Sequence, residues 1–555
     1  MSRKKNKSAK RAAGTAPQPP EIAELLAIVE RTQSGALSAE EHEKLKTAIS
    51  TLTFLMEELQ KKQTSLVRLR RLLFGAPTEK TRSVLEACAA QESTSPPNPA
   101  EESETKPRPK VPGHGRYSAA AYTGADKVTV PHPLLQGGQE CPGCQKGRVY
   151  ALAEPSVRVR ITGVAPLGAT VYECDRLRCN LCGEVYTAPA PEGVGSEKYD
   201  ATAASMIGLL KYGTGLPFNR IEKLQAGMRI PLAATTQWEQ VEAAAQTFAP
   251  VHEALIDTAA QGSVVYNDDT TMKVLKLTRE QRAAALAPDA DQERTGVFTS
   301  GIVATAAGQK IALFFTGVRH AGENLAEVLK RRAETLPPPI QMSDALACNT
   351  PGDFETVRAS CNSHARRNFV DVVESFPEEV RFVLETLREV YKIDALARQD
   401  NLDPEQRLQL HQSQSAPRMQ ALHEWMQAQF EQRKVEPNSS LGAAITHMQK
   451  HWDRLTLFLR VANAPLDSNI VERALKKAIL NRRNSLFYKT LNGAHVGDVF
   501  MSLIHTAELN GVPPFDYLVA LLRHADQILD NPSEWLPWNY QATLARLSAR
   551  DGPTE

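Results

Sequence analysis

The sequence predicts a multidomain protein of mixed α/β class, with a long helical insertion in its largest domain. Its 555 residues suggest three or four domains of roughly 150 residues each, and its 42% apolar content is enough for sizeable cores. From residue 261 onward, strand-like and helix-like segments alternate, and a block of long amphipathic helices interrupts them. Before that region stand a heptad leucine pattern and two Cys-x-x-Cys pairs.

Charge and cysteine content narrow the function classes. The net charge of +1 gives no overall bias toward nucleic acid, although the first eleven residues contain six basic and no acidic residues. No apolar run reaches about 18 residues, so we expect no membrane helix, and no apolar segment follows the basic start as in a secretory signal. The eight cysteines cluster, which favours metal binding in a reducing compartment over a disulfide scaffold.

The first 90 residues are expected to hold a basic tail and a coiled coil. Residues 1–37 read as a disordered basic tail followed by a short helix, and residues 38–90 as a leucine zipper. Ser38 followed by Glu41 has the spacing of a capping box. Leucine recurs every seven residues at Leu45, Leu52, Leu59, Leu66 and Leu73. This repeat predicts a coiled-coil seam, with a helix packed against its own protein as the alternative.

A linker and a zinc ribbon are expected next. Residues 91–126 are rich in Pro, Ser, Glu and Gly, as linkers are. Residues 127–190 carry two cysteine knuckles, formed by Cys141, Cys144, Cys179 and Cys182. Four thiolates on paired knuckles predict one tetrahedral Zn²⁺, which is structural because no coordination position stays open. Unmetallated cysteines are the alternative.

Residues 191–260 are expected to be a helical DNA-binding region. Short helical patterns are broken around residues 213–217 and at Gly227, which resembles a helix-turn-helix arrangement. Arg220, Lys223 and Arg229 would give it a basic face. A plain helical connector fits the same pattern.

The catalytic domain is expected to come in two parts around the helical insertion. Its first part, 261–376, shows strands at 263–275, 295–306 and 309–317, a helix from Gly322, a strand ending near Asp344, and a strand at 357–361 leading into a helix. This order is that of an RNase H-like domain, apart from the unassigned segment between Asp344 and Val357. Residues 377–463 form the insertion, 464–525 the second part of the domain, and 526–555 a C-terminal tail without a clear pattern.

Three acidic residues stand where catalysis would need them. Asp268 and Asp269 end a run of strand formers, and carboxylates leave water at a high cost unless they are paired or bind a metal. Cleavage of a phosphodiester needs an activated oxygen nucleophile and charge relief on the leaving oxygen, which two Mg²⁺ or Mn²⁺ ions about 3.5–4 Å apart supply. Asp268, Asp344 and Glu472 would hold these ions through their oxygens. Basic residues follow Glu472 and would hold phosphates: Arg473, Lys476, Lys477, Arg482 and Arg483.

Each acidic residue also has a plain structural interpretation. Asp269 rather than Asp268 could face the site, because neighbouring strand residues point to opposite sides. Asn469 and Glu472 have the spacing of a capping box at a helix start. Asp344 could simply end its strand in a turn.

Several segments resemble one known family. RLRRLLFGAPTEK (68–80), the two knuckles with APAP (188–191), GLPFNRIEKL (215–224), NDDT (267–270), CNSHARRNF (361–369) and PLDSNIVERALKKAILNRRNSLF (465–487) are similar to segments of the transposases of the insertion-sequence family numbered sixty-six. The similarity runs over most of the chain. The sequence departs from the family pattern at Asp269, where glutamate is usual, at Ser468, where asparagine is usual, and at His505, where an acidic residue is usual.

This resemblance implies a function and site residues. It implies that Asp268, Asp344 and Glu472 form a DDE triad, which cuts at element ends and joins 3′-hydroxyls to target DNA. In the Cys361-x-x-His364 motif, two ligands do not make a metal site, so we favour a structural role in which His364 and Arg366 or Arg367 lie beside the catalytic sheet or the DNA.

The resulting hypothesis is a DNA transposase of a bacterial insertion element. Its expected partners are double-stranded DNA, a second copy in a homodimer or higher oligomer, and small accessory proteins of the same element. The expected location is the cytoplasm, in association with the nucleoid. The alternative is a catalytically inactive, zinc-containing DNA-binding regulator derived from a transposase.

Overall fold

The structure is a computed structural model of the whole chain. It describes residues 38, 42–43, 45–46, 84, 134, 136, 138–140, 142, 144–146, 148–149, 164–178, 185–189, 191–192, 197–286 and 294–550. The predicted basic tail, nearly all of the coiled coil, the linker and most of the zinc ribbon lie outside these residues. Among the helices of the described part, none is long and apolar enough to cross a membrane. The elements below belong to one compact unit, which excludes residues 95–168.

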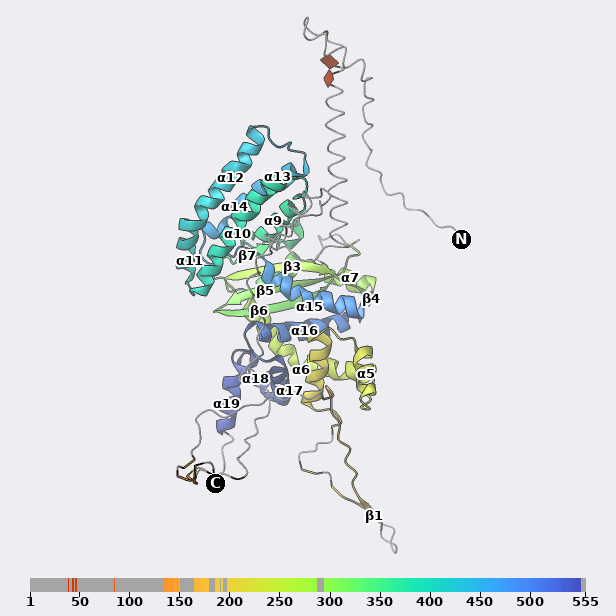
Figure 1. Cartoon of the computed structure of the whole chain (residues 1–555). Helices are drawn as coiled ribbons and strands as arrows, with labels where there is room; N and C mark the ends of the chain where they lie inside the picture. Colours follow the sequence, from red (N-terminus) through yellow and green to blue (C-terminus); the bar gives the residue numbers. More distant parts are fainter. Residues whose placement is uncertain are drawn as a thin grey trace, which may run out of the picture. The chain divides into compact units, whose positions relative to one another are not determined.

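A five-stranded mixed sheet forms the centre of this unit (Figure 1). Its strand order is β6-β5-β3-β7-β8. β5 (Phe298–Ala306) pairs antiparallel with both β3 (Val264–Thr271) and β6 (Gln309–Gly317). β7 (Ile340–Ser343) and β8 (Val357–Ser360) are parallel to β3. The chain is therefore of mixed α/β class as expected, and Asp268 stands on the central strand.

The predicted strand over 263–275 is in fact two strands. β3 ends at Thr271, and β4 (Val274–Lys276) leaves the central sheet to pair in parallel with β9 (Tyr488–Thr490). The prediction of one strand was wrong because β4 finds its partner more than 200 positions away, where Tyr488 N donates to Lys273 O at 2.9 Å. This small sheet joins the segment after Asp268 to the segment after α15.

The edge strand β6 is covered by α16 (Leu491–Leu509). Three polar side chains at four-residue spacing on α16 accept hydrogen bonds from alternate backbone N–H groups of β6: Asp498 from Thr316 (2.6 Å), Ser502 from Phe314 (3.0 Å) and Thr506 from Ala312 (3.0 Å). Four residues of helix rise about 6 Å and two residues of strand about 6.7 Å, so the two spacings match. The outer N–H groups of this edge are satisfied by side chains where a further strand would otherwise pair.

Other helices pack around the sheet. α15 (Asn469–Ser485) packs against β3 and β5, and α8 (Ala321–Leu329) also contacts β3 and β5. α6 (Ala234–Ala260) contacts β5, β6 and α16, and its buried residues include Phe248, Val251 and Leu255. α9 (Asn362–Val370) follows β8 directly, as the sequence predicted. The short η3 (Ala347–Asn349) lies in the segment between β7 and β8 that the sequence left unassigned.

Residues 377–463 are helical, as their amphipathic patterns predict (Figure 1). They form α10 (Pro377–Gln399), α11 (Pro404–Leu410), η4 (His411–Ser415), α12 (Ala416–Glu431), α13 (Ser440–Lys450), α14 (Trp452–Leu455) and η5 (Leu457–Leu459). One hydrophobic core joins α10, α12 and α13 with α9 and the strands β7 and β8. The helical block therefore shares the core beneath the sheet.

Shorter elements complete the unit. α4 (Ala201–Gly208), η2 (Leu209–Gly213) and α5 (Phe218–Gly227) precede α6. β1 (Arg176–Arg178) and β2 (Val185–Thr187) form a two-stranded antiparallel sheet. α17 (Pro514–Arg523) lies at the end of the segment 464–525. The C-terminal tail, in which no pattern was recognised, begins within α18 (Ala525–Asp530) and contains η6 (Pro532–Trp535) and α19 (Tyr540–Arg550). Trp535 is fully buried there, and its carbonyl accepts from the Tyr517 hydroxyl at 2.9 Å.

Candidate functional site

Asp268 is a half-buried carboxylate in the middle of the sheet. It pairs with Gly301 across β3 and β5, and its Oδ1 accepts from the backbone N of Asp269 at 2.8 Å. Burial raises its pKa to about 6, and the charge of Asp344 acts in the same direction, against the hydrogen bond from Asp269 and the charge of His364. Because its pKa lies well above the ordinary value of 3.8, the ionised form of this carboxylate would be stabilised by a cation bound nearby.

Asp344 immediately follows the last residue of β7. β7 is parallel to β3 and next to it, so Asp344 is carried to the same region as Asp268. Its Oδ1 accepts from Leu346 N at 3.1 Å and from the Asn349 side-chain amide. The turn that the sequence offered as an alternative is therefore present, and it orients one oxygen while the carboxylate still acts on Asp268.

Glu472 lies in the first turn of α15. The capping-box alternative is wrong: the helix begins at Asn469 with Ser468 as N-cap, no side chain caps it, and Asn469 Nδ2 instead donates to Asp467 at 2.8 Å. Glu472 Oε1 is buried and accepts no hydrogen bond from the described residues. Two basic residues lie close to it: His364, with Nδ1 at 3.7 Å from Oε1, and Arg367, with Nη2 at 3.6 Å from Oε2. An orphaned carboxylate oxygen needs a ligand.

His364 connects the three acids. Its charge lowers the pKa of Asp268, and it faces Glu472. Its own pKa is raised by its hydrogen bond with Cys361 and by the charge of Glu472, against the effect of burial. A cavity of about 470 Å³ is lined by Asp344, His364 and Arg367 together with neighbouring residues of α9 and α13. The structure thus brings Asp344, which follows β7, and the basic residues His364 and Arg367 of α9 to one cavity.

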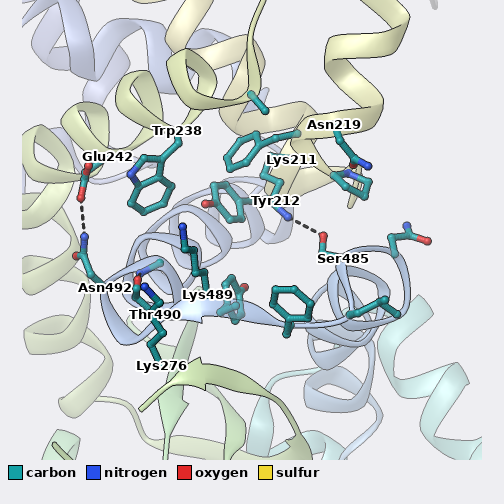
Figure 2. A pocket seen from close by; sticks show the side chains of 18 residues that line it. Lys211, Tyr212, Asn219, Trp238, Glu242, Lys276, Ser485, Lys489, Thr490 and Asn492 are labelled. Atoms are coloured by element: carbon teal, nitrogen blue, oxygen red, sulfur yellow. Dashed lines mark hydrogen bonds between the residues drawn. The ribbon is translucent and has the colours of Figure 1, made fainter. Parts of the chain in front are cut away.

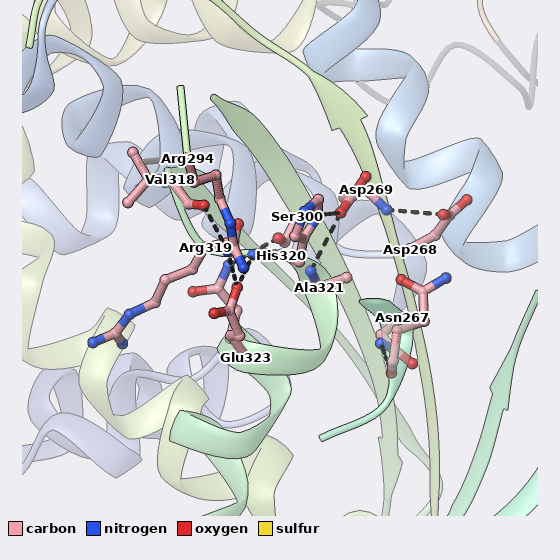
Figure 3. A network of polar contacts seen from close by, with 12 residues as sticks. Asn267, Asp268, Asp269, Arg294, Ser300, Val318, Arg319, His320, Ala321 and Glu323 are labelled. Carbon is pink, nitrogen blue, oxygen red and sulfur yellow. Dashed lines mark hydrogen bonds and ion pairs between the residues drawn. The ribbon is translucent and has the colours of Figure 1, made fainter. Parts of the chain in front are cut away.

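Asp269 faces the other way, toward α8 (Figure 3). Its Oδ2 is 2.7 Å from His320 Nδ1 and accepts from Ala321 N at 3.4 Å, at the N-terminus of α8. Next to it, Glu323 accepts from His320 N and Arg294, both at 2.6 Å. Asp269 therefore attaches α8 to the central strand.

Two of the acidic residues, Glu472 and Asp269, each belong to a group of three side chains whose chemistry could hold a metal ion. The ligand atoms of Cys361, His364 and Glu472 are all within 4.8 Å of one another, as are those of Asp269, His320 and Cys348. Cys361 is buried, and its sulfur accepts from Ser468 N at 3.3 Å. The motif Cys361-x-x-His364 thus has a third neighbour, Glu472, which the sequence did not place with it.

The predicted phosphate-binding residues have different surroundings. Arg473, Lys476 and Arg483 are exposed along α15. Lys477 pairs with Glu508 at 2.9 Å, and Arg482 donates to Thr270 and Thr271 on β3, at 3.2 Å and 2.6 Å to their hydroxyls. Lys477 and Arg482 therefore hold α15 to its neighbours.

The comparisons with known proteins assign the family. Residues 198–496 match the family described as Transposase IS66 family. The chain belongs to the IS66 transposase family. Two relatives are from Sinorhizobium fredii (strain NBRC 101917 / NGR234). Uncharacterized protein y4jD is 27% identical over 90% of this chain and 98% of its own length, and uncharacterized protein y4hP is 24% identical over 76% and 77%.

Membership of the IS66 family indicates the general class of function to which the site belongs. It supports a transposase-like role, and it implies action on DNA with divalent metal. The matched range includes the three acidic residues and α15. Sequence reasoning missed His320 and Asn349, which hold Asp269 and Asp344. In the sequence, His320 is only a polar residue before a predicted helix, and Asn349 only a polar residue in an unassigned segment.

Proposed function

We propose that this IS66-family protein is a DDE transposase, which cleaves DNA at the ends of its element and joins the 3′-hydroxyls to target DNA. The observation that supports this most directly is the convergence of acidic residues: the charges of Asp344 and His364 both act on Asp268, and His364 Nδ1 lies 3.7 Å from Glu472 Oε1. The catalytic domain is RNase H-like in this proposal. Its strand order β6-β5-β3-β7-β8, with the first three strands antiparallel and the last two parallel to β3, agrees with that fold.

The residues fit divalent metal ions. Burial and the charge of Asp344 raise the pKa of Asp268, so a bound cation would stabilise its charged form. Oε1 of Glu472 is buried and accepts no hydrogen bond from the described residues, which leaves it open to a metal ion. Asp268, Asp344 and Glu472 would hold Mg²⁺ or Mn²⁺ through carboxylate oxygens. Bound there, the ions would activate the attacking oxygen and stabilise the leaving oxygen.

The protein's own residues would position the DNA. Arg473, Lys476 and Arg483 present exposed charges on the helix that carries Glu472, where they would hold phosphates. Arg366 and Arg367 lie on α9, and Arg367 lines the cavity beside Asp344. Lys477 and Arg482 would fix α15 rather than contact DNA, because they are bound to Glu508 and to Thr270 and Thr271.

The N-terminal part would assemble the complex. Of the four predicted zinc ligands only Cys144 lies among the described residues, where it is exposed. In this proposal a structural Zn²⁺ is bound by Cys141, Cys144, Cys179 and Cys182, and the leucine zipper forms a homodimer. Residues 191–260 bind DNA. Small accessory proteins of the element take part, and the protein associates with the nucleoid. Two element ends processed together suit a dimer.

Cleavage of a DNA carrying the element's terminal repeats tests the proposal. With Mg²⁺, Asp268→Asn and Glu472→Gln are expected to lower the rate by roughly 10²–10⁴-fold, since several kcal/mol of charge stabilisation is lost. Asp269→Asn is the matched control, because it alters the neighbouring carboxylate on the α8 side. If both triad variants cut as fast as the unmodified protein, the triad is wrong. DNA-end binding without any cleavage would support the inactive regulator instead.

A further inference from the structure

A second cavity lies at the other end of α15 from Glu472. It has a volume of about 1010 Å³, at the upper end of the usual range for ligand pockets. Its walls come from η2, α5, α6, the small β4–β9 sheet and the last turn of α15. None of the acidic residues discussed above lines it. Figure 2 shows the side chains of Trp238, Tyr212 and Lys489 converging on this space.

Aromatic rings form much of the wall. The lining residues include Tyr212, Phe218, Trp238, Phe487 and Tyr488. Tyr212 and Tyr488 are buried, whereas Phe218 and Trp238 keep partly exposed rings. Flat, partly exposed rings in a concave site are suited to stacking against another planar group.

A buried lysine stands in the wall of the cavity. Lys211 is 6% exposed, and its Nζ donates to Asn481 and Ser485, both at 2.8 Å. The same Nζ lies 5.4 Å from the ring centre of Phe218 and 5.6 Å from that of Tyr212. Among the described residues no carboxylate forms an ion pair with it. This cation is therefore held by neutral groups, and its environment favours an electron-rich or anionic ligand.

The mouth carries further positive charge. Lys276 and Lys489 are exposed lining residues on the paired strands β4 and β9, and no ion pair engages either of them within the described part of the chain. The acidic lining residue, Glu242, accepts from Asn492 at 2.6 Å. The cavity thus combines apolar stacking surface with a net excess of lysine.

Apolar side chains project at the rim. Leu486 is 65% and Phe487 39% exposed, although both line the cavity. Leu486 has φ of 69°, in the left-handed region that is strained for a residue with a Cβ. Strain and exposure together on an apolar residue are unusual, because neither stabilises the free protein. Exposed leucine and phenylalanine can act as wedges that separate stacked bases.

Two elements link this cavity to the catalytic residues. β3 and β4 are nearly continuous, so Lys276 follows Asp268 by eight positions. α15 begins beside Glu472 and supplies Asn484 and Ser485 to the wall. Twelve residues of helix from Glu472 to Asn484 span about 18 Å. That length corresponds to about five base-pair steps of a duplex at 3.4 Å per step.

We propose that this cavity binds an unpaired nucleotide of the DNA substrate, a few nucleotides from the bond that is cut. The base would stack on Trp238 and Phe218, with its polar edge near Lys211. The flanking phosphates would contact Lys276 and Lys489, and Leu486 would occupy the position that the base leaves. The assignment rests on the proposed function, which supplies DNA as the substrate. It adds a recognition site that the three carboxylates do not provide.

Equilibrium binding by the full chain tests this site. The probes are a fluorescein-labelled duplex with an oligo-thymidine 3′ tail and the same duplex with blunt ends. Trp238→Ala is expected to weaken binding of the tailed duplex about 5- to 150-fold, the usual effect of losing one stacking partner, and to change binding of the blunt duplex less than about twofold. Trp238→Phe should restore most of the affinity. Lys276→Gln with Lys489→Gln should weaken tailed binding and lower its salt dependence.

Controls separate this inference from folding and from catalysis. Lys273→Gln removes an exposed lysine that precedes β4 but does not line the cavity, and it should bind both probes normally. Lys276 and Lys489 are exposed, so replacing them leaves the core intact. The double-lysine variant therefore tests the site even if a Trp238 variant fails to fold. Unchanged tailed binding in the Trp238→Ala and double-lysine variants, or an equal loss on both probes, would overturn the proposal. If the protein cuts element ends while Trp238→Ala binds the tail normally, only this inference fails; tail-specific binding without cleavage means that only the proposed function fails.

Discussion

Gly301 is the point at which a single methyl group should displace α15, the helix that carries Glu472. It pairs with Asp268 across the sheet, and α15 packs over it. A Cβ at this position would lie 3.0 Å from both Leu475 Cγ and Leu475 Cδ2, and 3.3 Å from Val471 Cγ2. Comfortable carbon contacts are about 3.5–4.0 Å, so α15 must move by roughly 0.5–1 Å or Leu475 must change rotamer.

The expected magnitude follows from this overlap. Overpacking of a core costs about 1–3 kcal/mol, so Gly301→Ala should lower the free energy of unfolding by that amount. Because α15 carries Glu472, a displacement near 1 Å should also lower the rate of metal-dependent DNA cleavage by about 10²-fold. Chemical denaturation and the cleavage assay measure the two effects.

Gly317→Ala is the matched control. Gly317 is in the same sheet, at the end of β6, and a Cβ there meets nothing within 4 Å. It should leave stability unchanged or raise it by about 0.4–1 kcal/mol through the unfolded chain. Leu475→Ala combined with Gly301→Ala should cost less than the sum of the single changes. If Gly301→Ala matches Gly317→Ala in both assays, α15 is not seated on β5 as described.

The remaining predictions concern the helical insertion and the N-terminal part. Asp394 is nearly buried with Arg407 (2.7 Å) and His411 (3.3 Å), so Asp394→Asn should cost about 3–5 kcal/mol in denaturation, whereas Asp400→Asn at the exposed end of α10 should cost little. Burial alone would raise the pKa of Asp394, but the hydrogen bond with His411 and the charge of Arg407 outweigh burial and hold this pKa at about 2. The ionised carboxylate therefore contributes roughly 2 kcal/mol to the free energy of unfolding above pH ~4, and this contribution is lost as the pH falls through about 2. A free energy of unfolding that does not change between these pH values would contradict this. Metal analysis should find one zinc per chain that disappears with Cys141→Ser and Cys179→Ser, and zinc removal should disorder residues 127–190 without unfolding the catalytic part; finding no zinc would refute the ribbon. Deleting residues 38–74 should reduce the oligomer mass in light scattering, and an unchanged mass would mean that the leucine repeat packs internally.

Local pattern was enough to predict much of the sheet. The bounds of β6 agree with the predicted 309–317, and β7 ends just before Asp344. These strands are short apolar runs whose limits are set by neighbouring turn residues, so the information lies within a few positions. The relation of Asp268 to Asp344 followed from topology, because parallel neighbours bring their carboxyl ends together.

Contacts between distant segments were not accessible in this way. β4 pairs with β9, and His320 binds Asp269, through matches that span 51 to more than 200 positions. The polar stripe Asp498, Ser502 and Thr506 on a mostly buried helix was a visible signal, yet its meaning depends on the strand that it meets. The capping-box interpretation of Asn469 and Glu472 was wrong for a similar reason. The Asn469 side chain donates to Asp467 and to the distant Ser363 and does not cap α15.

The cover that α16 provides for β6 has a consequence for synthesis of the chain. The strand is complete at Gly317, but the last helix residue that satisfies it, Thr506, is made 189 residues later. At about 5–20 residues per second, the strand edge waits roughly 10–40 s on the ribosome for its partner. During that interval its N–H groups are open to pairing with other chains. Interrupted translation within the helical insertion should therefore yield aggregating fragments, whereas chains that extend past Leu509 can bury the edge within themselves.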